Sequence, residues 1–184
     1  MQIRNYFLIA VGGAVIGAAS GFALRALDSA DQSAMQSPVK TVAQVDVVPS
    51  FSYQDLDGRH RHSDEFADKV LVLNFWATWC PPCREETPEF VALQETFAGD
   101  VQFIGIAIDD EEPVREFADT FNMNYPVVLG DIEAISLSRQ LGNRYEGLPF
   151  TVVAAPGGDV ILRHAGSLER VKLETILRDL TRAG

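Results

Sequence analysis

Cysteine is scarce in this sequence, with two residues, Cys80 and Cys83, among 184. A structural zinc site would need further cysteines or well-spaced histidines as ligands. The three histidines, His60, His62 and His164, do not have that spacing. We therefore expect no metal and no other cofactor, and the cysteine pair itself is the candidate reactive group.

Basic residues are also few. The sequence has 15 Lys and Arg against 26 Asp and Glu, which gives a formal net charge of −11. An acidic domain is repelled by phosphate backbones and anionic lipid headgroups, so nucleic-acid binding is not expected. The sequence contains no P-loop and no glycine-rich dinucleotide fingerprint. Apolar residues make up 47% of the chain, which is enough for a packed core.

Charged residues are absent from positions 6–24. A helix of that length reaches about 28 Å, close to the roughly 30 Å hydrocarbon core of a bilayer. We therefore predict a single-pass transmembrane anchor over residues 1–25, with the rest of the chain translocated across the membrane. The alternative is a cleaved signal peptide, because Gly21-Phe22-Ala23 fits a small-x-small cleavage site. Either segment exports the domain that follows.

The remainder of the chain divides into a linker and a domain. Residues 26–45 are rich in Ser, Ala, Gln, Asp and Pro without periodicity, which predicts a flexible linker. In the predicted domain, residues 46–184, apolar runs over 70–75 and 101–108 are typical of strands buried on both faces. Helical spacing of apolar residues predicts helices between and after these strands, and 151–164 predicts a hairpin. This order predicts an α/β fold with a central mixed sheet covered by helices on both faces.

Residues 79–83 read Trp-Cys-Pro-Pro-Cys and lie between a predicted strand and a predicted helix. Pro81 and Pro82 suit the first turn of a helix, where their missing N–H groups would be unpaired anyway, so we expect Cys80 at the helix start with an exposed sulfur. The helix dipole there lowers a thiol pKa from about 8.5 to roughly 3.5–7.5. Cys80 is therefore the predicted nucleophile, and the more buried Cys83 is predicted to resolve the mixed disulfide.

The segment around the cysteines carries a family resemblance. Residues 73–83, Leu-Asn-Phe-Trp-Ala-Thr-Trp-Cys-Pro-Pro-Cys, resemble membrane-anchored thioredoxin-like thiol-disulfide oxidoreductases of the TlpA, ResA and CcmG type. The resemblance runs from about Pro49 to the end of the chain. It implies a thioredoxin-like fold, tethered to a bacterial cytoplasmic membrane with its C-terminal domain in the periplasm or otherwise outside the membrane.

The same resemblance implies a second half of the site in Gly147-Leu148-Pro149. In the resembled family this proline forms a cis peptide bond and faces the cysteines. The backbone of Leu148 would then pair with an incoming peptide as an added strand. The residues expected to contact the substrate are Trp79, Pro81, Pro82, Leu148 and Pro149.

Glu86 lies one helical turn after Cys83, where the resembled group has an acid that tunes the thiols. We expect Glu86 to be desolvated, with a raised pKa, and to assist deprotonation of Cys83 as a third catalytic residue. The alternative is a solvated first-turn acid that stabilises the helix dipole. Asn74 stands where cytoplasmic thioredoxins carry a buried Asp, so that route for the proton is absent.

The expected function is reduction of protein disulfides outside the cytoplasm. Keeping a dithiol reduced in an oxidising compartment requires an electron supply, so the resemblance implies a transmembrane thiol donor of the DsbD or CcdA kind. The expected substrates are apocytochrome c thiols or a copper-handling protein of oxidase assembly. The alternatives are a disulfide oxidant or isomerase, and a metallochaperone-like module whose two thiolates hold Cu(I).

Overall fold

The structure, a computed structural model, describes residues 44–182. The predicted transmembrane anchor, residues 1–25, and residues 26–43 of the predicted linker lie outside the described residues. Within 44–182, no helix combines the length and the apolar character needed to cross a membrane.

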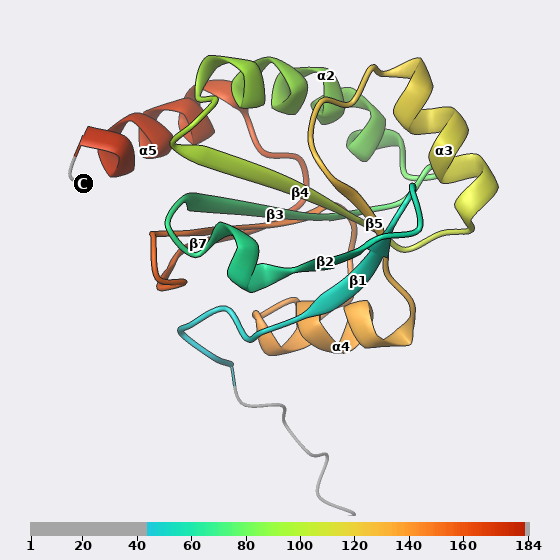
Figure 1. Cartoon of the computed structure of the whole chain (residues 1–184), viewed down its shortest axis with the longest axis horizontal. Helices are drawn as coiled ribbons and strands as arrows, with labels where there is room; N and C mark the ends of the chain where they lie inside the picture. Colours follow the sequence, from blue (N-terminus) through green and yellow to red (C-terminus); the bar gives the residue numbers. More distant parts are fainter. Residues whose placement is uncertain (1–43, 183–184) are drawn as a thin grey trace, which may run out of the picture. The chain divides into compact units, whose positions relative to one another are not determined.

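A seven-stranded mixed sheet forms the centre of the described domain (Figure 1). Its strands are β1 (Ser52–Asp55), β2 (His60–His62), β3 (Val70–Trp76), β4 (Val101–Ala107), β5 (Val127–Leu129), β6 (Phe150–Ala154) and β7 (Val160–Ala165). The order across the sheet is β2-β1-β5-β4-β3-β6-β7, in which β3, β4 and β5 are parallel and the other pairings are antiparallel. The two long apolar runs of the sequence form β3 and β4, which lie in the middle of the sheet, as predicted.

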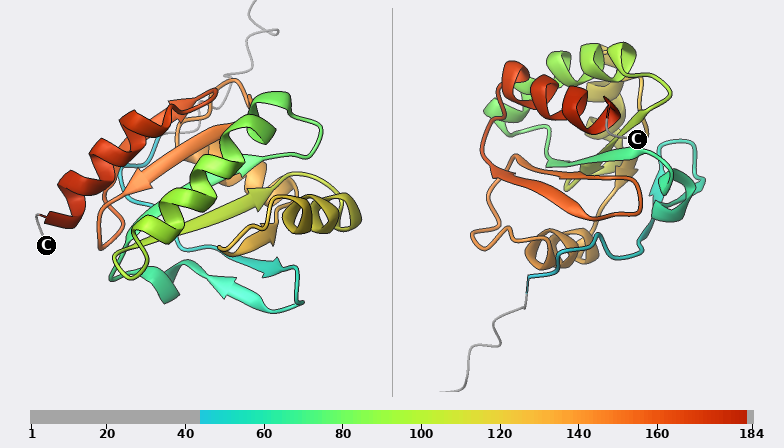
Figure 2. Two further views of the ribbon diagram at one scale, coloured as in Figure 1. Left: turned by 90° about the horizontal axis from the view of Figure 1, so that it is seen from above. Right: turned by 90° about the vertical axis from the view of Figure 1, so that its left-hand side faces the viewer.

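Helices cover both faces of this sheet. They are α2 (Pro81–Thr96), α3 (Glu111–Thr120), α4 (Ile132–Gln140) and α5 (Arg170–Arg182), with a 3-10 turn, η1 (Ser63–Phe66), after β2. Figures 1 and 2 show α2 and α5 side by side on one face and α4 on the opposite face. The predicted α/β fold with a central mixed sheet between helices is therefore confirmed.

The alternation of side chains along β3 builds the two cores. Leu71, Leu73 and Phe75 belong to the core beside α4, whereas Val70 and Val72 belong to the core beside α2 and α5. Successive residues of a strand point to opposite faces, so a continuous apolar run fills both cores at once. This packing holds the end of β3, and with it the start of α2, in a fixed place.

Gly105 in β4 leaves room for the last residue of β3. A Cβ atom at this position would lie 2.9 Å from Nε1 of Trp76 and 3.4 Å from a ring carbon of Tyr125. We therefore expect Gly105→Ala to lower the free energy of unfolding by about 1–3 kcal/mol, because the packed indole must shift. Chemical denaturation measures this change. Gly147→Ala is the control, since nothing lies within 4 Å of its added Cβ; equal stability of the two variants would contradict the expectation.

Candidate active site

The two cysteines form a disulfide at the start of α2. The Cys80–Cys83 S–S distance is 2.05 Å, and the two Cα atoms are 5.3 Å apart. Cys80 is the N-cap residue, Pro81 and Pro82 follow in the first turn, and the Cys83 N–H donates to the Cys80 Sγ at 3.3 Å. The predicted position of the pair at a helix start, between a buried strand and a helix, is therefore confirmed.

The exposure of Cys80 differs from the sequence expectation. The sequence predicts an exposed sulfur, but Cys80 is only 3% exposed in the disulfide form, and Cys83 is 1% exposed. The reason is packing, since both cysteines belong to an apolar cluster with Trp76 and Ala77. Trp79, which precedes the pair, is 67% exposed, and Pro81 is exposed too, so the exposed apolar surface of the motif belongs to these two residues and not to the cysteines.

The loop before Cys80 is held by an acid from the neighbouring strand end. The Thr78 N–H donates to Asp109 Oδ2 at 3.0 Å, and the Thr78 hydroxyl donates to the same oxygen. The Asp110 N–H donates to Asp109 Oδ1 at 2.9 Å. Sequence reasoning missed this role of Asp109. The signal was its position just after β4, because the carboxyl ends of adjacent parallel strands meet at one edge of a sheet.

The segment before β6 supplies the other side of the site. The peptide bond between Leu148 and Pro149 is cis, as the resemblance implied. Leu148 is half-buried and packs against the apolar cluster that contains the cysteines. Asn143 Nδ2 donates to the Gly147 carbonyl at 3.0 Å and so supports this segment. Leu148 and the two cysteines, about 65 residues apart in sequence, thus meet in one cluster.

Glu86 lies in α2, one helical turn after Cys83, and is buried, with 3% of its surface exposed. Its Oε1 accepts from Asn74 Nδ2 at 2.9 Å, and its Oε2 accepts from the Leu168 N–H at 3.1 Å. Burial raises the pKa of Glu86 from its ordinary 4.5 to about 7, against the opposing effect of these two hydrogen bonds. The expected desolvation and raised pKa are confirmed, and the alternative of a solvated first-turn acid is wrong for Glu86.

Burial of Glu86 also couples stability to pH. Its pKa is about 7 in the folded protein and ordinarily 4.5, so between these values the folded state binds more protons than the unfolded state. The contribution of Glu86 to stability is therefore fully present below about pH 4.5, and about 3 kcal/mol of it is lost as pH rises through about 7. Glu86→Gln should remove this slope from the unfolding free energy of the oxidised protein, measured between about pH 4.5 and about pH 8. Parallel pH curves for the two proteins would contradict the assignment.

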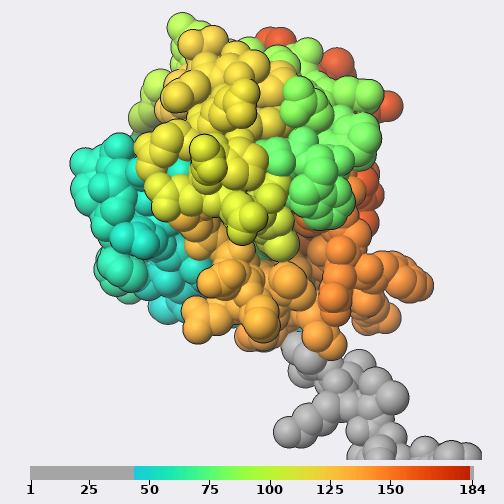
Figure 3. Space-filling model, turned by 90° about the vertical axis from the view of Figure 1, so that its right-hand side faces the viewer, coloured from blue at the N-terminus to red at the C-terminus, as the bar shows by residue number. Residues whose placement is uncertain are grey.

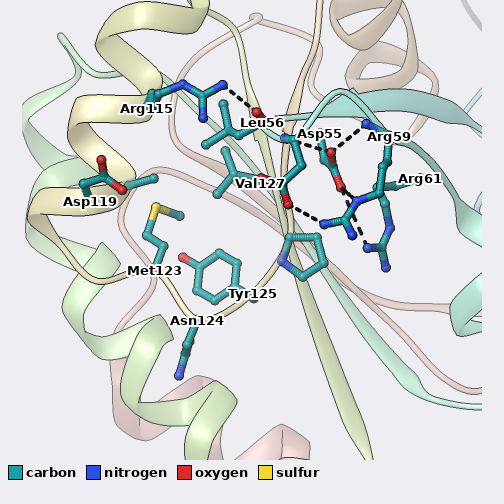
Figure 4. A pocket seen from close by; sticks show the side chains of 13 residues that line it. Asp55, Leu56, Arg59, Arg61, Arg115, Asp119, Met123, Asn124, Tyr125 and Val127 are labelled. Atoms are coloured by element: carbon teal, nitrogen blue, oxygen red, sulfur yellow. Dashed lines mark hydrogen bonds and ion pairs between the residues drawn. The ribbon is translucent and has the colours of Figure 1, made fainter.

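A pocket of about 510 Å³ lies away from the disulfide, between the β1–β2 turn and the segment from α3 to β5 (Figure 4). Its arginines already have acidic partners. Arg59 and Arg61 lie 3.5 Å and 3.9 Å from Asp55 Oδ2, and Arg115 lies 2.7 Å from Glu111 Oε1. Because the cysteines do not line this pocket, we assign the chemistry to the disulfide and not to it.

A smaller pocket of about 260 Å³ adjoins the active-site segment. Its lining includes Trp79, which precedes α2, and Arg84 in the first turn of α2. Phe117 of α3 and Phe121, the residue after this helix, line the other side. The Arg84 guanidinium lies over both phenylalanine rings, 5.3 Å and 5.5 Å from their centres. Figure 3 shows this side of the molecule, with α3 in yellow beside the green start of α2.

His, Cys, Asp and Glu side chains are the usual metal ligands in proteins. Within 44–182, no group of three or more His, Cys, Asp and Glu side chains is arranged to hold a metal ion. His60 and His62 are exposed on the edge strand β2.

Known proteins share both the sequence pattern and this architecture. Residues 43–177 match the Redoxin family. Thioredoxin-like protein YneN of Bacillus subtilis is 30% identical over 130 residues, which cover 68% of this chain and 74% of that protein. Thiol-disulfide oxidoreductase ResA of Halalkalibacterium halodurans is 28% identical over 167 residues, which cover 89% of this chain and 88% of that protein.

A solved structure supports the same relationship. The crystal structure of a thiol:disulfide interchange protein of the thioredoxin family from Chlorobium tepidum TLS has a TM-score of 0.66 and 30% identity, covering 76% of this chain and 98% of its own. This chain therefore belongs to the Redoxin family and is a thiol-disulfide oxidoreductase of the ResA type.

Proposed function

We propose that this protein reduces disulfides of other proteins on the outer side of a bacterial cytoplasmic membrane. The observation that carries the proposal is the Cys80–Cys83 disulfide at the start of α2, one helical turn from the buried Glu86. A helix start favours a thiolate at Cys80, and a carboxyl group that titrates near neutral pH suits proton transfer with Cys83.

The reaction starts from the dithiol form. The Cys80 thiolate attacks a partner's disulfide, so that a new S–S bond joins Cys80 to the partner and the partner's other sulfur leaves as a thiolate. Cys83 then transfers its thiol proton to the Glu86 carboxylate and attacks the Cys80 sulfur. The partner's second sulfur leaves, two electrons have passed to the partner, and the Cys80–Cys83 disulfide is formed.

The surface around the disulfide suits an extended polypeptide. Trp79 and Pro81 are exposed, Pro82 is half-buried, and the half-buried Leu148 packs against the apolar cluster that contains the cysteines. We assign these residues, with Pro149, to substrate contact. The Leu148 backbone offers hydrogen-bonding groups to an incoming strand, as in other cases where a peptide adds to a sheet or loop edge.

The sequence supports a proposal for the location and for the electron source. The uncharged segment 6–24 supports a single-pass membrane anchor over residues 1–25, with the C-terminal domain in the periplasm. A dithiol in an oxidising compartment must be reduced again after each turnover, so we propose a transmembrane thiol donor of the DsbD or CcdA kind as a partner. We propose apocytochrome c or a copper-assembly protein as the substrate.

The reduction potential of the cysteine pair tests the direction of the reaction. We expect a value near or below about −270 mV, as in thioredoxin, because the proposed function is that of a reductant. Equilibration of the purified protein with glutathione or dithiothreitol buffers, followed by thiol alkylation, measures it. A value near about −120 mV would make the protein a disulfide donor instead. Retention of Cu(I) through gel filtration, without reduction of any protein disulfide, would point to the metallochaperone alternative.

A further inference from the structure

Three buried polar side chains from β6, β3 and α2 form a connected chain in the core. Thr151, Asn74 and Glu86 are 0%, 5% and 3% exposed. Asn74 Nδ2 donates to Glu86 Oε1 at 2.9 Å and to Thr151 Oγ1 at 3.1 Å. A side-chain amide nitrogen carries two hydrogens, so these two bonds use its full donor capacity. The orientation of the Asn74 amide is therefore set from both sides.

The sheet register makes this arrangement possible. Asn74 of β3 is the antiparallel partner of Thr151 in β6. Thr151 lies two residues after Pro149, in the strand that follows the proposed docking segment. Glu86 projects from the first turns of α2 onto the same region. Asn74 thus connects the strand behind the substrate-binding segment to the helix that carries both cysteines.

Neutral groups are the main partners of the Glu86 carboxyl group. Glu86 takes part in none of the ion pairs within residues 44–182. The donors to its two oxygens are the Asn74 amide and the Leu168 N–H, which comes from the segment between β7 and α5. Removing either donor from a buried carboxylate disfavours its charged form.

Other titratable groups around Glu86 do not replace these donors. Tyr125 lies near enough that the Glu86 charge, after burial, raises its pKa, so this phenol stays neutral. Arg170 of α5 is paired with Glu89 of α2 at 2.8 Å on the exposed side of the helix contact. His164 of β7, opposite Thr151 in the sheet, directs its ring to the Ser167 carbonyl at 3.0 Å.

We propose that Asn74 is a positioning residue that holds Glu86 in place for proton exchange with Cys83. The Thr151 hydroxyl orients the Asn74 amide for this role. This inference rests on the proposed function, because it concerns the step in which Cys83 loses its proton and attacks the mixed disulfide. This role differs from that of the buried Asp that cytoplasmic thioredoxins carry at the position of Asn74. Asn74 itself exchanges no proton, but it sets where the carboxyl group lies and at which pH it accepts one.

The test follows the two half-reactions separately in the purified full chain. The probe is the aromatic disulfide 5,5′-dithiobis(2-nitrobenzoate), which releases one coloured thiolate when Cys80 attacks and a second when Cys83 resolves the mixed disulfide. We expect Asn74→Leu to slow the second release at least about tenfold at neutral pH and to move its pH midpoint up by about one unit. The first release should change less than about twofold, because Cys80 does not use Glu86.

Two comparisons separate positioning from a general loss of stability. Gln94 is another buried amide of α2, bonded to Val101 and Phe103, so Gln94→Leu removes a comparable group away from the disulfide. We expect Gln94→Leu to leave both releases and their pH midpoints as in the wild type. Thr151→Val should show a smaller version of the Asn74→Leu shift, and Thr151→Ser, which keeps the hydroxyl, should restore the wild-type profile.

A double-mutant cycle decides the outcome. If Asn74 acts through Glu86, Asn74→Leu will have no further effect on the second release in a Glu86→Gln background. An equal slowing in both backgrounds, or an unmoved pH midpoint in folded Asn74→Leu, would overturn the proposal. If Asn74→Leu does not fold, comparing the second release of Thr151→Val with that of Thr151→Ser provides the same test. Absence of both releases in the wild type would instead refute the proposed function.

Discussion

Replacing Cys80 with serine is expected to abolish reduction of protein disulfides, whereas replacing Cys83 with serine is expected to trap the partner. For Cys80→Ser the rate should fall at least about 1000-fold, because a serine hydroxyl is not ionised near neutral pH and the nucleophile is lost. For Cys83→Ser the first attack remains, but no second sulfur is available to break the mixed disulfide. The two variants therefore stop the reaction at different points.

The position of the two residues supports this division of roles. Cys80 is the N-cap of α2 and lies next to the exposed Trp79, whereas Cys83 lies inside the first turn and is the more buried of the two. A partner thus reaches Cys80 first. Because Cys80 is itself only 3% exposed in the disulfide form, we expect the partner to contact the surface around Trp79 and Leu148 before exchange occurs.

Non-reducing electrophoresis and intact mass measure this outcome. The Cys83→Ser protein, mixed with an oxidised disulfide protein such as insulin, should give a covalent adduct that a reductant releases. The double variant, with both cysteines replaced, is the control and should give none. Turnover by Cys80→Ser, or a stable adduct on Cys83 in that variant, would reverse the assigned roles.

The second large effect is expected for Glu86→Gln. The resolution step should slow by about 100-fold at about pH 7.5, the range in which a positioned general base contributes. The direction of the pH dependence of this step follows from the pKa of Glu86, which is raised to about 7. Below this pH the carboxyl group is protonated and accepts no proton from Cys83, so the wild-type rate should rise as pH increases through about 7. In Glu86→Gln that rise should be lost, and the rate should follow the ionisation of the thiol alone.

Glu85 supplies a matched control for this experiment. Glu85 is the preceding acid of the same helix and is exposed, whereas Glu86 is buried. Glu85→Gln removes the same formal charge and should leave the pH profile of the resolution step as in the wild type. An unchanged profile in Glu86→Gln, or equal changes in both variants, would show that Glu86 acts only through its charge or not at all.

Local features of the sequence were sufficient for the fold class and for the reactive pair. The apolar run of β3 predicts a strand buried on both faces, and the two prolines after Cys80 predict a helix start. These signals act within a few residues, so they need no knowledge of the rest of the fold. They placed Cys80 and Cys83 at a strand-to-helix junction, and the resemblance added Pro149 and Glu86. The membrane anchor over residues 1–25 stays a prediction.

Contacts between distant segments were decided by the tertiary structure alone. The burial of Cys80 depends on how the end of β3 packs against its apolar cluster, and the support of Thr78 by Asp109 depends on two neighbouring strand ends. The bonds of Asn74 to Glu86 and Thr151 join positions 12 and 77 residues away. Periodicity and capping patterns carry no information on such pairs, because a hydrogen-bond partner and a desolvated site exist only after the sheet and the helices have packed together.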